Sequence, residues 1–277
     1  MDKRVVTIII FFAVFAVLLI IGATVFVVRD IEVSFATAEE ANVITSEEIM
    51  AASEIETGRN IFAISETRAV FNIEKAHPAI KVINIERKFP STIIIHVTAR
   101  IPILAVQISG GQNYAMLDRE MFVVEVVSQA ELIARETQFG YSLTRAGYQL
   151  DAADVILGEV VDEDASNENV ITQNLIVAFE KQNLLNQEFS DFIAEVKVTR
   201  ESGRSVYDVA MTTRSGLDIL FEANSDLKDE VRLSYAWYCA EIARVGSNAE
   251  SVTTGYIAYI SGDDNEDGYF TWYRYSE

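Results

Sequence analysis

The longest apolar stretch of the sequence runs from Val5 to Val28. It contains no Asp, Glu, Lys, Arg, His, Asn or Gln. As a helix rising about 1.5 Å per residue, the stretch would reach roughly 36 Å, enough to cross a hydrocarbon core about 30 Å thick. Lipid offers no partners for backbone N–H and C=O groups, so a run of this kind is expected to be helical. The pattern therefore predicts one membrane-spanning helix over residues 5–28.

The charges that flank this run predict its orientation. Lys3 and Arg4 precede it, whereas Arg29 and Asp30 cancel each other on the other side. The excess of cations favours a cytoplasmic N-terminus of residues 1–4, with the remainder of the chain outside. The alternative is a cleaved signal peptide, because Ala36-Thr37-Ala38 has the small-x-small pattern of a cleavage site. Signal cores are usually only about 7–15 residues long, which favours the anchor.

Two helices are expected soon after the apolar run. Residues 31–35 alternate apolar and polar as a strand does. Thr45 and Glu48 have the spacing of a capping box, and Gly58-Arg59-Asn60 should end the helix that they open. A second helix should start after Ser65 and stop at His77-Pro78, because the residue before proline avoids helical angles.

Two alternating strands follow, over residues 80–87 and 92–100, and Phe89-Pro90-Ser91 forms the turn between them. Their apolar positions include Ile83 and Ile85 in the first strand and Ile93, Ile95 and Val97 in the second. The order strand, helix, helix, strand, strand predicts a compact α+β domain over residues 31–100. Its helices should cover one face of a three-stranded sheet.

The second half of the chain predicts an antiparallel sheet flanked by helices. Helical spacing is clear over 170–187 and 226–245, while 129–139 fits either a short helix or an irregular crossing, and 151–169 reads as loop. The gaps between strands carry good hairpin residues, such as Glu201-Ser202-Gly203-Arg204. The strands are expected over 103–108, 114–118, 121–127, 192–199, 205–212, 217–221, 252–260 and 269–275.

Charge excludes some classes of partner. The 277 residues include 22 Lys and Arg against 42 Asp and Glu, a net charge of −20. The residues before Arg29 contribute +1, so the exported part carries −21. Nucleic-acid binding depends on Lys and Arg neutralising phosphates. We therefore do not expect a chain as acidic as this one to bind nucleic acid.

The sequence gives no sign of an enzyme, a cofactor or a metal site. Cys239 is the only cysteine, and His77 and His96 are the only histidines, without a Cys or His at ligand spacing. Asp263, Asn265, Asp267 and Gly268 match the opening of a calcium loop, but the position that should hold a bidentate Glu is Arg274. An acidic turn explains this segment, so we predict no metal.

Four segments of the first domain resemble the FtsQ/DivIB family of bacterial cell-division proteins. In chain order they read ITSEEI from Ile44, GRNIF from Gly58, HPAI from His77 and IERKFPSTI from Ile85. Three strands and two helices in the order strand, helix, helix, strand, strand, after a single membrane helix, look like a POTRA domain. Two features depart from the family: Val33–Thr37 lacks the usual glycine, and Ala99-Arg100 stands where Glu-Arg is usual.

The second half, residues 101–277, is similar to the β-domain of the same family. The similarity follows Gly216–Leu220, the long helix after it, Gly255-Tyr256-Ile257 and Tyr269-Phe270. Leu117-Asp118-Arg119-Glu120 resembles the family's Asp-x-x-Gly turn with its glycine replaced. The resemblance implies a single-pass protein of type II topology in the cytoplasmic membrane, located at the division septum. It would act as a non-catalytic scaffold that supports septal wall synthesis.

The partners implied by the resemblance are small single-pass proteins with coiled coils, of the FtsB/DivIC and FtsL kinds. Independently of the family, the end of the chain is rich in aromatic residues, and a late strand could lie at a sheet edge and pair with an incoming strand. Carried onto this chain, the resemblance points to Thr254, Tyr256, Ile257, Ala258, Tyr259, Ile260, Tyr269, Phe270 and Trp272 as the binding residues.

Two other classes of function remain open from the sequence. One is a membrane-anchored extracytoplasmic receptor or sensor, which a stabilising small ligand would support. The other is a hydrolase that acts on the cell wall, which would need a pair of carboxylates whose mutation abolishes turnover. Carboxylate pairs are common in a chain as acidic as this one, so none identifies such a site.

Overall fold

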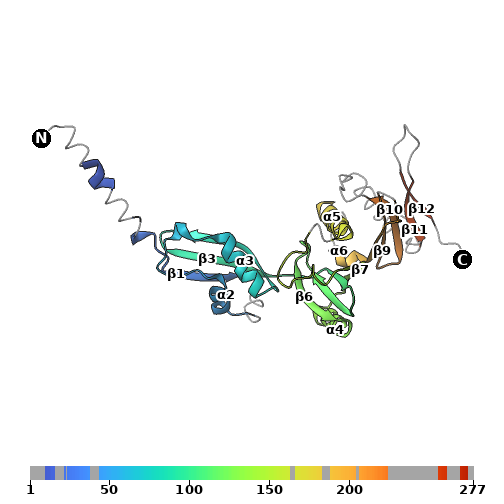
Figure 1. Ribbon diagram of the computed structural model, residues 1–277, viewed down its shortest axis with the longest axis horizontal. Coiled ribbons are helices and arrows are strands. Elements are labelled where there is room, and N and C mark those ends of the chain that lie inside the picture. Colours follow the sequence, from blue (N-terminus) through green and yellow to red (C-terminus); the bar gives the residue numbers. More distant parts are fainter. Residues whose placement is uncertain are drawn as a thin grey trace. The chain divides into compact units, whose positions relative to one another are not determined.

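The computed structural model describes residues 10–15, 22, 24–37, 44–162, 166–182, 188–203, 206–223, 255–260 and 269–273 (Figure 1). The chain divides into two compact units, Met1–Arg100 and Ile101–Glu277. Five of the sequence-based expectations fall outside the described residues: the N-terminal tail of residues 1–4, the helix over 226–245, Cys239, Thr254 and the acidic loop over 263–268.

The apolar run near the N-terminus is described in part. Residues 10–15 are helical, and their large apolar side chains are exposed. Within the described ranges, we find no helix with both the length and the apolar character needed to cross a bilayer.

The first unit is an α+β domain with a small sheet. Its strand order is β1-β3-β2, in which β1 runs parallel and β2 antiparallel to β3. Helix α2 contacts β1 and helix α3 contacts β2. The elements are β1 (Asp30–Phe35), α2 (Ser46–Ser53), the 3-10 turn η2 (Ile61–Ala63), α3 (Glu66–Ala76), β2 (Ile80–Lys88) and β3 (Thr92–Ala99).

Both predicted helix starts are confirmed. Thr45 and Glu48 form the expected capping box, and Ser65 accepts a hydrogen bond from the Arg68 N–H. His77 ends α3, as its place before proline predicted. Helix α2 ends earlier than expected, because Glu54 takes a left-handed conformation (φ 53°) and closes the helix before the glycine is reached.

The alternation predicted for β2 is wrong at one position. Ile83 is 56% exposed, whereas Val82 and Ile85 on either side of it are buried. The register of β2 against β3 shifts between Val82 and Asn84, and such a bulge reverses the side to which the following residues point. Ile93, Ile95 and Val97 of β3 are completely buried, as expected.

A buried ion pair joins α3 to the end of β3. Arg100 Nη2 lies 2.7 Å from Glu74 Oε2, and the Arg100 side chain is 2% exposed. The second carboxylate oxygen of Glu74 accepts a hydrogen bond from the Val82 N–H at 2.9 Å, beside the bulge. Arg100, at the place where the family usually has Glu-Arg, therefore holds the last strand of the domain against its helix.

The second unit contains a sheet whose nine described strands follow the order β12-β11-β10-β9-β8-β7-β4-β5-β6. Its strands are β4 (Leu104–Ile108), β5 (Asn113–Leu117), β6 (Val123–Ser128), β7 (Thr144–Leu150), β8 (Ile193–Thr199), β9 (Tyr207–Thr213), β10 (Leu217–Ala223), β11 (Gly255–Ile260) and β12 (Tyr269–Tyr273). Its helices are α4 (Gln129–Phe139), α5 (Asn167–Gln182) and α6 (Phe189–Phe192).

Helices α4 and α5 lie on opposite faces of this sheet. Leu104 and Val106 of β4 belong to the same buried cluster as Ile171 and Leu175 of α5. Ala105, between them on the strand, packs instead in a second cluster with Leu132 of α4. Successive residues of a strand point to opposite faces, so the two clusters mark the two faces.

The expectation of an antiparallel sheet in this half is corrected. β7 runs parallel to both β4 and β8, and β11 runs parallel to β10, so the sheet is mixed. Strand β7 was missed altogether, because TRAGYQL contains a glycine and little apolar alternation. Close packing against β8 requires the glycine at position 147, because a Cβ added there would lie 2.6 Å from Cγ of Lys197.

Candidate functional site

The nine-stranded sheet ends on one side at β12. This strand pairs with β11 in antiparallel fashion, and no other strand among the described residues pairs with it. One side of its backbone is thus an edge of the sheet, at which an extended segment of another chain could add as a further strand. In Figure 1, β11 and β12 lie side by side next to β10.

The register at this end separates the candidate residues into two alternating sets. Ile257 lies opposite Trp272 and also opposite Ile219 of β10, which is completely buried in the core. Ala258 lies opposite Thr271 and Leu220, on the other phase of the strands. Residues directly opposite each other share a face of the sheet. Ile257 therefore takes a core-phase position, and Ala258 does not.

The remaining candidates fall into the same two sets. Tyr259 and Phe270 are opposite each other and in phase with Ile257. Tyr256 is half-buried and opposite Tyr273, and Ile260 is opposite Tyr269. All the predicted binding residues whose backbone is described lie on the last two strands. The structure brings them together, and it adds the division by phase, which the sequence alone could not assign.

The opposite end of the sheet is covered. Beside β6, the N–H of Val123 donates to the carbonyl of Glu159, and the N–H of Gly158 donates to the carbonyl of Val123. Helix α4 contacts the same strand, and Arg135 holds Glu125 through two hydrogen bonds of 3.0 and 2.6 Å. The loop over 158–161 thus pairs with the start of this edge, and α4 packs on one face of the sheet beside it.

The turn before β6 is held by Asp118. Its Oδ1 accepts hydrogen bonds from the backbone N–H groups of Glu120 and Phe122, at 2.8 and 3.0 Å. Met121 follows with a left-handed backbone (φ 59°), a conformation that favours glycine. This fits the resemblance to an Asp-x-x-Gly turn, with Met121 in the place of the glycine.

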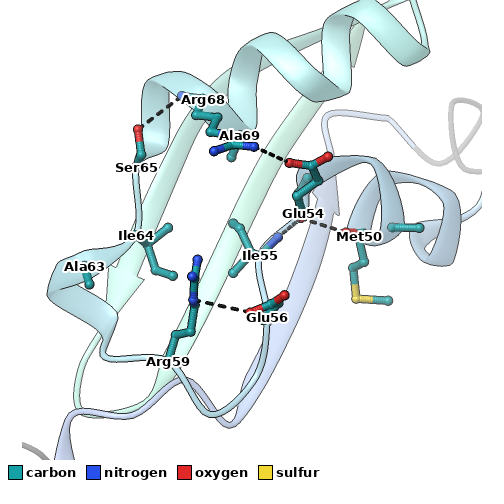
Figure 2. A pocket seen from close by; sticks show the side chains of 12 residues that line it. Met50, Glu54, Ile55, Glu56, Arg59, Ala63, Ile64, Ser65, Arg68 and Ala69 are labelled. Atoms are coloured by element: carbon teal, nitrogen blue, oxygen red, sulfur yellow. Dashed lines mark hydrogen bonds and ion pairs between the residues drawn. The ribbon is translucent and has the colours of Figure 1, made fainter.

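A groove of about 730 Å³ lies in the first unit, along α2, the loop after it and the start of α3 (Figure 2). Two ion pairs lie among the residues that line it: Arg68 with Glu54 at 3.1 Å, and Arg59 with Glu56 at 3.3 Å. All four charged side chains are well exposed, and their charges cancel. Exposed pairs of this kind contribute little to stability and do not by themselves define a ligand.

Both histidines lie in the first unit, and the two tyrosines with a raised pKa lie in the second. His96 lies 3.3 Å from Glu86 on the surface of the small sheet, and His77 caps α3. Burial, followed by the nearby Asp191, raises the pKa of Tyr141 to about 12, and burial also raises the pKa of Tyr148. Both phenols therefore stay protonated at neutral pH. No group of three or more His, Cys, Asp or Glu side chains gathers at a metal site within the described ranges.

Comparison with known families identifies the first unit as a POTRA domain. Residues 29–100 match the family described as "POTRA domain, FtsQ-type". This match supports the assignment of the chain to the FtsQ/DivIB family on the domain whose four segments carry the resemblance. No curated protein matches the chain. A domain of this type is a scaffold for protein interactions in cell division rather than a catalytic domain.

Proposed function

We propose that this protein is a non-catalytic, single-pass scaffold of the bacterial division machinery. The observation that carries the proposal is the FtsQ-type POTRA domain of residues 29–100, placed directly after the apolar run of residues 5–28. The apolar run anchors the chain in the cytoplasmic membrane with its N-terminus inside. The acidic bulk of the chain then acts outside the membrane, at the division septum.

The second unit holds the partners in this proposal. Small single-pass proteins with coiled coils, of the FtsB/DivIC and FtsL kinds, add an extended segment to the free edge of β12. The candidate contact residues are Thr254, Tyr256, Ile257, Ala258, Tyr259, Ile260, Tyr269, Phe270 and Trp272. Backbone hydrogen bonds supply affinity in such strand addition, and the alternating side chains supply specificity.

Anchoring in one membrane strengthens this interaction. Two proteins that share a bilayer meet at a high effective concentration, so a modest intrinsic affinity suffices for a stable complex. The net charge of −21 on the exported part keeps it soluble and disfavours nonspecific binding to anionic surfaces. Neither feature requires a bound cofactor or a catalytic group.

The test is a pull-down of the full-length chain from membranes, with proline placed at Phe270 or at Thr271. Neighbouring residues of an antiparallel strand direct their N–H groups to opposite sides, so only one of the two N–H groups faces the free edge. We expect the variant that lacks the edge-facing N–H to stay folded and to lose the small coiled-coil partners. The other variant removes an N–H that faces β11 and should lower the thermal unfolding temperature.

Each proline variant serves as the control for the other, because the two positions are adjacent and each substitution removes one backbone N–H. Recovery of the partners by a folded variant that lacks the edge-facing N–H would contradict strand addition at β12. The rival function, a receptor for a small ligand, has one observation in its favour, the groove of about 730 Å³. It would gain support if no coiled-coil protein were recovered with the unmodified chain.

A further inference from the structure

Three phenylalanines from separate segments of the first unit form one aromatic cluster. Phe26 lies near the end of the apolar run, Phe62 in η2, and Phe89 at the tip of the hairpin between β2 and β3. The ring centroids are 5.4 Å apart for Phe26 and Phe62, 6.0 Å for Phe26 and Phe89, and 5.4 Å for Phe62 and Phe89. Each ring therefore contacts the other two.

The cluster lies on the surface of the unit rather than in its core. Phe62 is 60% exposed and Phe89 is 55% exposed, while Phe26 is half-buried against the core. Large apolar groups that gather on a surface commonly mark a contact with a partner or a membrane. The completely buried Ile61, next to Phe62, shows that the domain already has a core at this end without the two exposed rings.

Backbone hydrogen bonds hold the end of the apolar run between the two segments that carry the exposed rings. On one side, the N–H of Val28 donates to the Arg59 carbonyl at 2.8 Å, and the N–H of Ile61 donates to the Phe26 carbonyl at 2.9 Å. On the other side, the N–H of Arg29 donates to the Ser91 carbonyl at 2.8 Å. The exposed rings are thus fixed next to the last residues of the run.

The charges around the cluster suit the surface of a lipid bilayer. Each ring has an exposed cation within three residues of it in the sequence: Arg29 after Phe26, Arg59 before Phe62 and Lys88 before Phe89. Arg59 pairs with Glu56 at 3.3 Å, which leaves Arg29 and Lys88 as the cations that can meet lipid. Aromatic rings with flanking cations are typical of protein segments that lie in the head-group region.

We propose that the cluster of Phe26, Phe62 and Phe89 inserts into the outer leaflet of the membrane that the 5–28 run crosses. This inference rests on the anchor in the proposed function, because the lipid surface meets the cluster only if the run ends there. The three rings sit at the boundary between head groups and acyl chains, and Arg29 and Lys88 contact lipid phosphates. The POTRA domain is thereby held against the bilayer in one orientation.

The experiment uses the full-length chain in vesicles of phosphatidylethanolamine and phosphatidylglycerol, with tryptophan introduced as F62W or F89W. Lipids brominated on the upper part of their acyl chains quench tryptophan that reaches them. Trp237 and Trp272 give a background, which the unmodified chain measures in the same vesicles. We expect the added fluorescence of both variants to be lost in brominated vesicles and kept in unbrominated ones.

Phe71 provides a matched control within the same domain. It is 51% exposed on α3, and its ring contacts Lys75 rather than the cluster. The fluorescence added by F71W should therefore remain in brominated vesicles. Equal fluorescence of F62W, F89W and F71W in brominated vesicles would overturn the inference, including the case in which another protein covers the cluster.

A second measurement separates this inference from the proposed anchor. Alkaline extraction of the same vesicles releases proteins that only adhere to the membrane and leaves spanning proteins in place. A chain released by this treatment would contradict both the anchor and the docked cluster. A chain that stays in the vesicles while F62W and F89W are unquenched would contradict the docked cluster alone.

Discussion

The two edges of the nine-stranded sheet differ in how their backbone groups are satisfied. At β6, the loop over 158–161 donates and accepts hydrogen bonds with residues 121–123, and α4 packs on one face of the strand. At β12, the described residues show pairing on one side only, with β11. Proteins generally cover or charge a sheet edge that must not pair with other chains. The proposed function places the partner at β12.

The last two strands extend the sheet beyond β10. β11 runs parallel to β10, and β12 runs antiparallel to β11, so that the two form a hairpin at the end of the sheet. The candidate partner-binding residues thus belong to a separate addition to the sheet, while the core around Ile219 is built by the preceding strands.

The largest fall in the free energy of unfolding is expected when a charge is placed at a core-phase position of the β11–β12 hairpin. Because Ile257 is in register with the completely buried Ile219, I257E should lower the free energy of unfolding of the second unit by about 3 kcal/mol or more. A258E, on the opposite phase, should change it by less than about 1 kcal/mol. Urea unfolding of the two variants measures this difference.

This pair also separates folding from binding. Loss of partner recovery by I257E alone would be ambiguous, because a charge there would disturb the sheet as well as the binding surface. A258E keeps the sheet intact and should show whether the outward phase touches the partner. Equal destabilisation by I257E and A258E would contradict the register on which the comparison of the two edges depends.

A smaller effect is expected at the covered edge, in the cap of α4. Ser128 Oγ donates to Glu131 Oε2 at 2.7 Å, and the Ser128 N–H donates to the same oxygen at 2.8 Å. S128A removes the hydroxyl and should lower the free energy of unfolding by about 1 kcal/mol. Partner recovery should not change, because this cap supports β6 rather than β12.

The cost of S128A should also depend on pH. The hydrogen bonds from the backbone and side chain of Ser128 lower the pKa of Glu131 from its ordinary 4.5. A lowered pKa stabilises the fold above pH 4.5, and this contribution is lost as the pH falls through the folded-state pKa. The difference between S128A and the unmodified chain should therefore shrink in acid. S128T keeps the hydroxyl, so its free energy of unfolding should match that of the unmodified chain both at neutral pH and in acid.

The POTRA domain was largely predictable because its signals are local. Thr45 with Glu48, Ser65, and the proline after His77 each act within one or two turns of the chain, and the structure places the helix starts and the second helix end where they predict. The error at Ile83 arose from a bulge, which depends on the pairing of β2 with β3 rather than on the sequence of β2 alone.

The second unit was less predictable because its order depends on distant pairings. β7 lies between β4 and β8, and both of these contacts are parallel and join segments far apart in the chain. The sequence TRAGYQL does not indicate that this strand lies between β4 and β8. The candidate binding residues were named from the resemblance and the aromatic end of the chain. Their division into core-phase and outward-phase positions required the register with β10.

The most direct test of the account is site-specific photo-crosslinking at the two edges. A photo-crosslinking amino acid is placed in the full-length chain at position 271 on β12 or at Val126 on β6, which is 39% exposed. We predict that position 271 crosslinks to a small single-pass coiled-coil protein in membranes and that position 126 does not. Crosslinks to such a protein from position 126, with none from position 271, would contradict the assignment of β12 as the partner-binding edge.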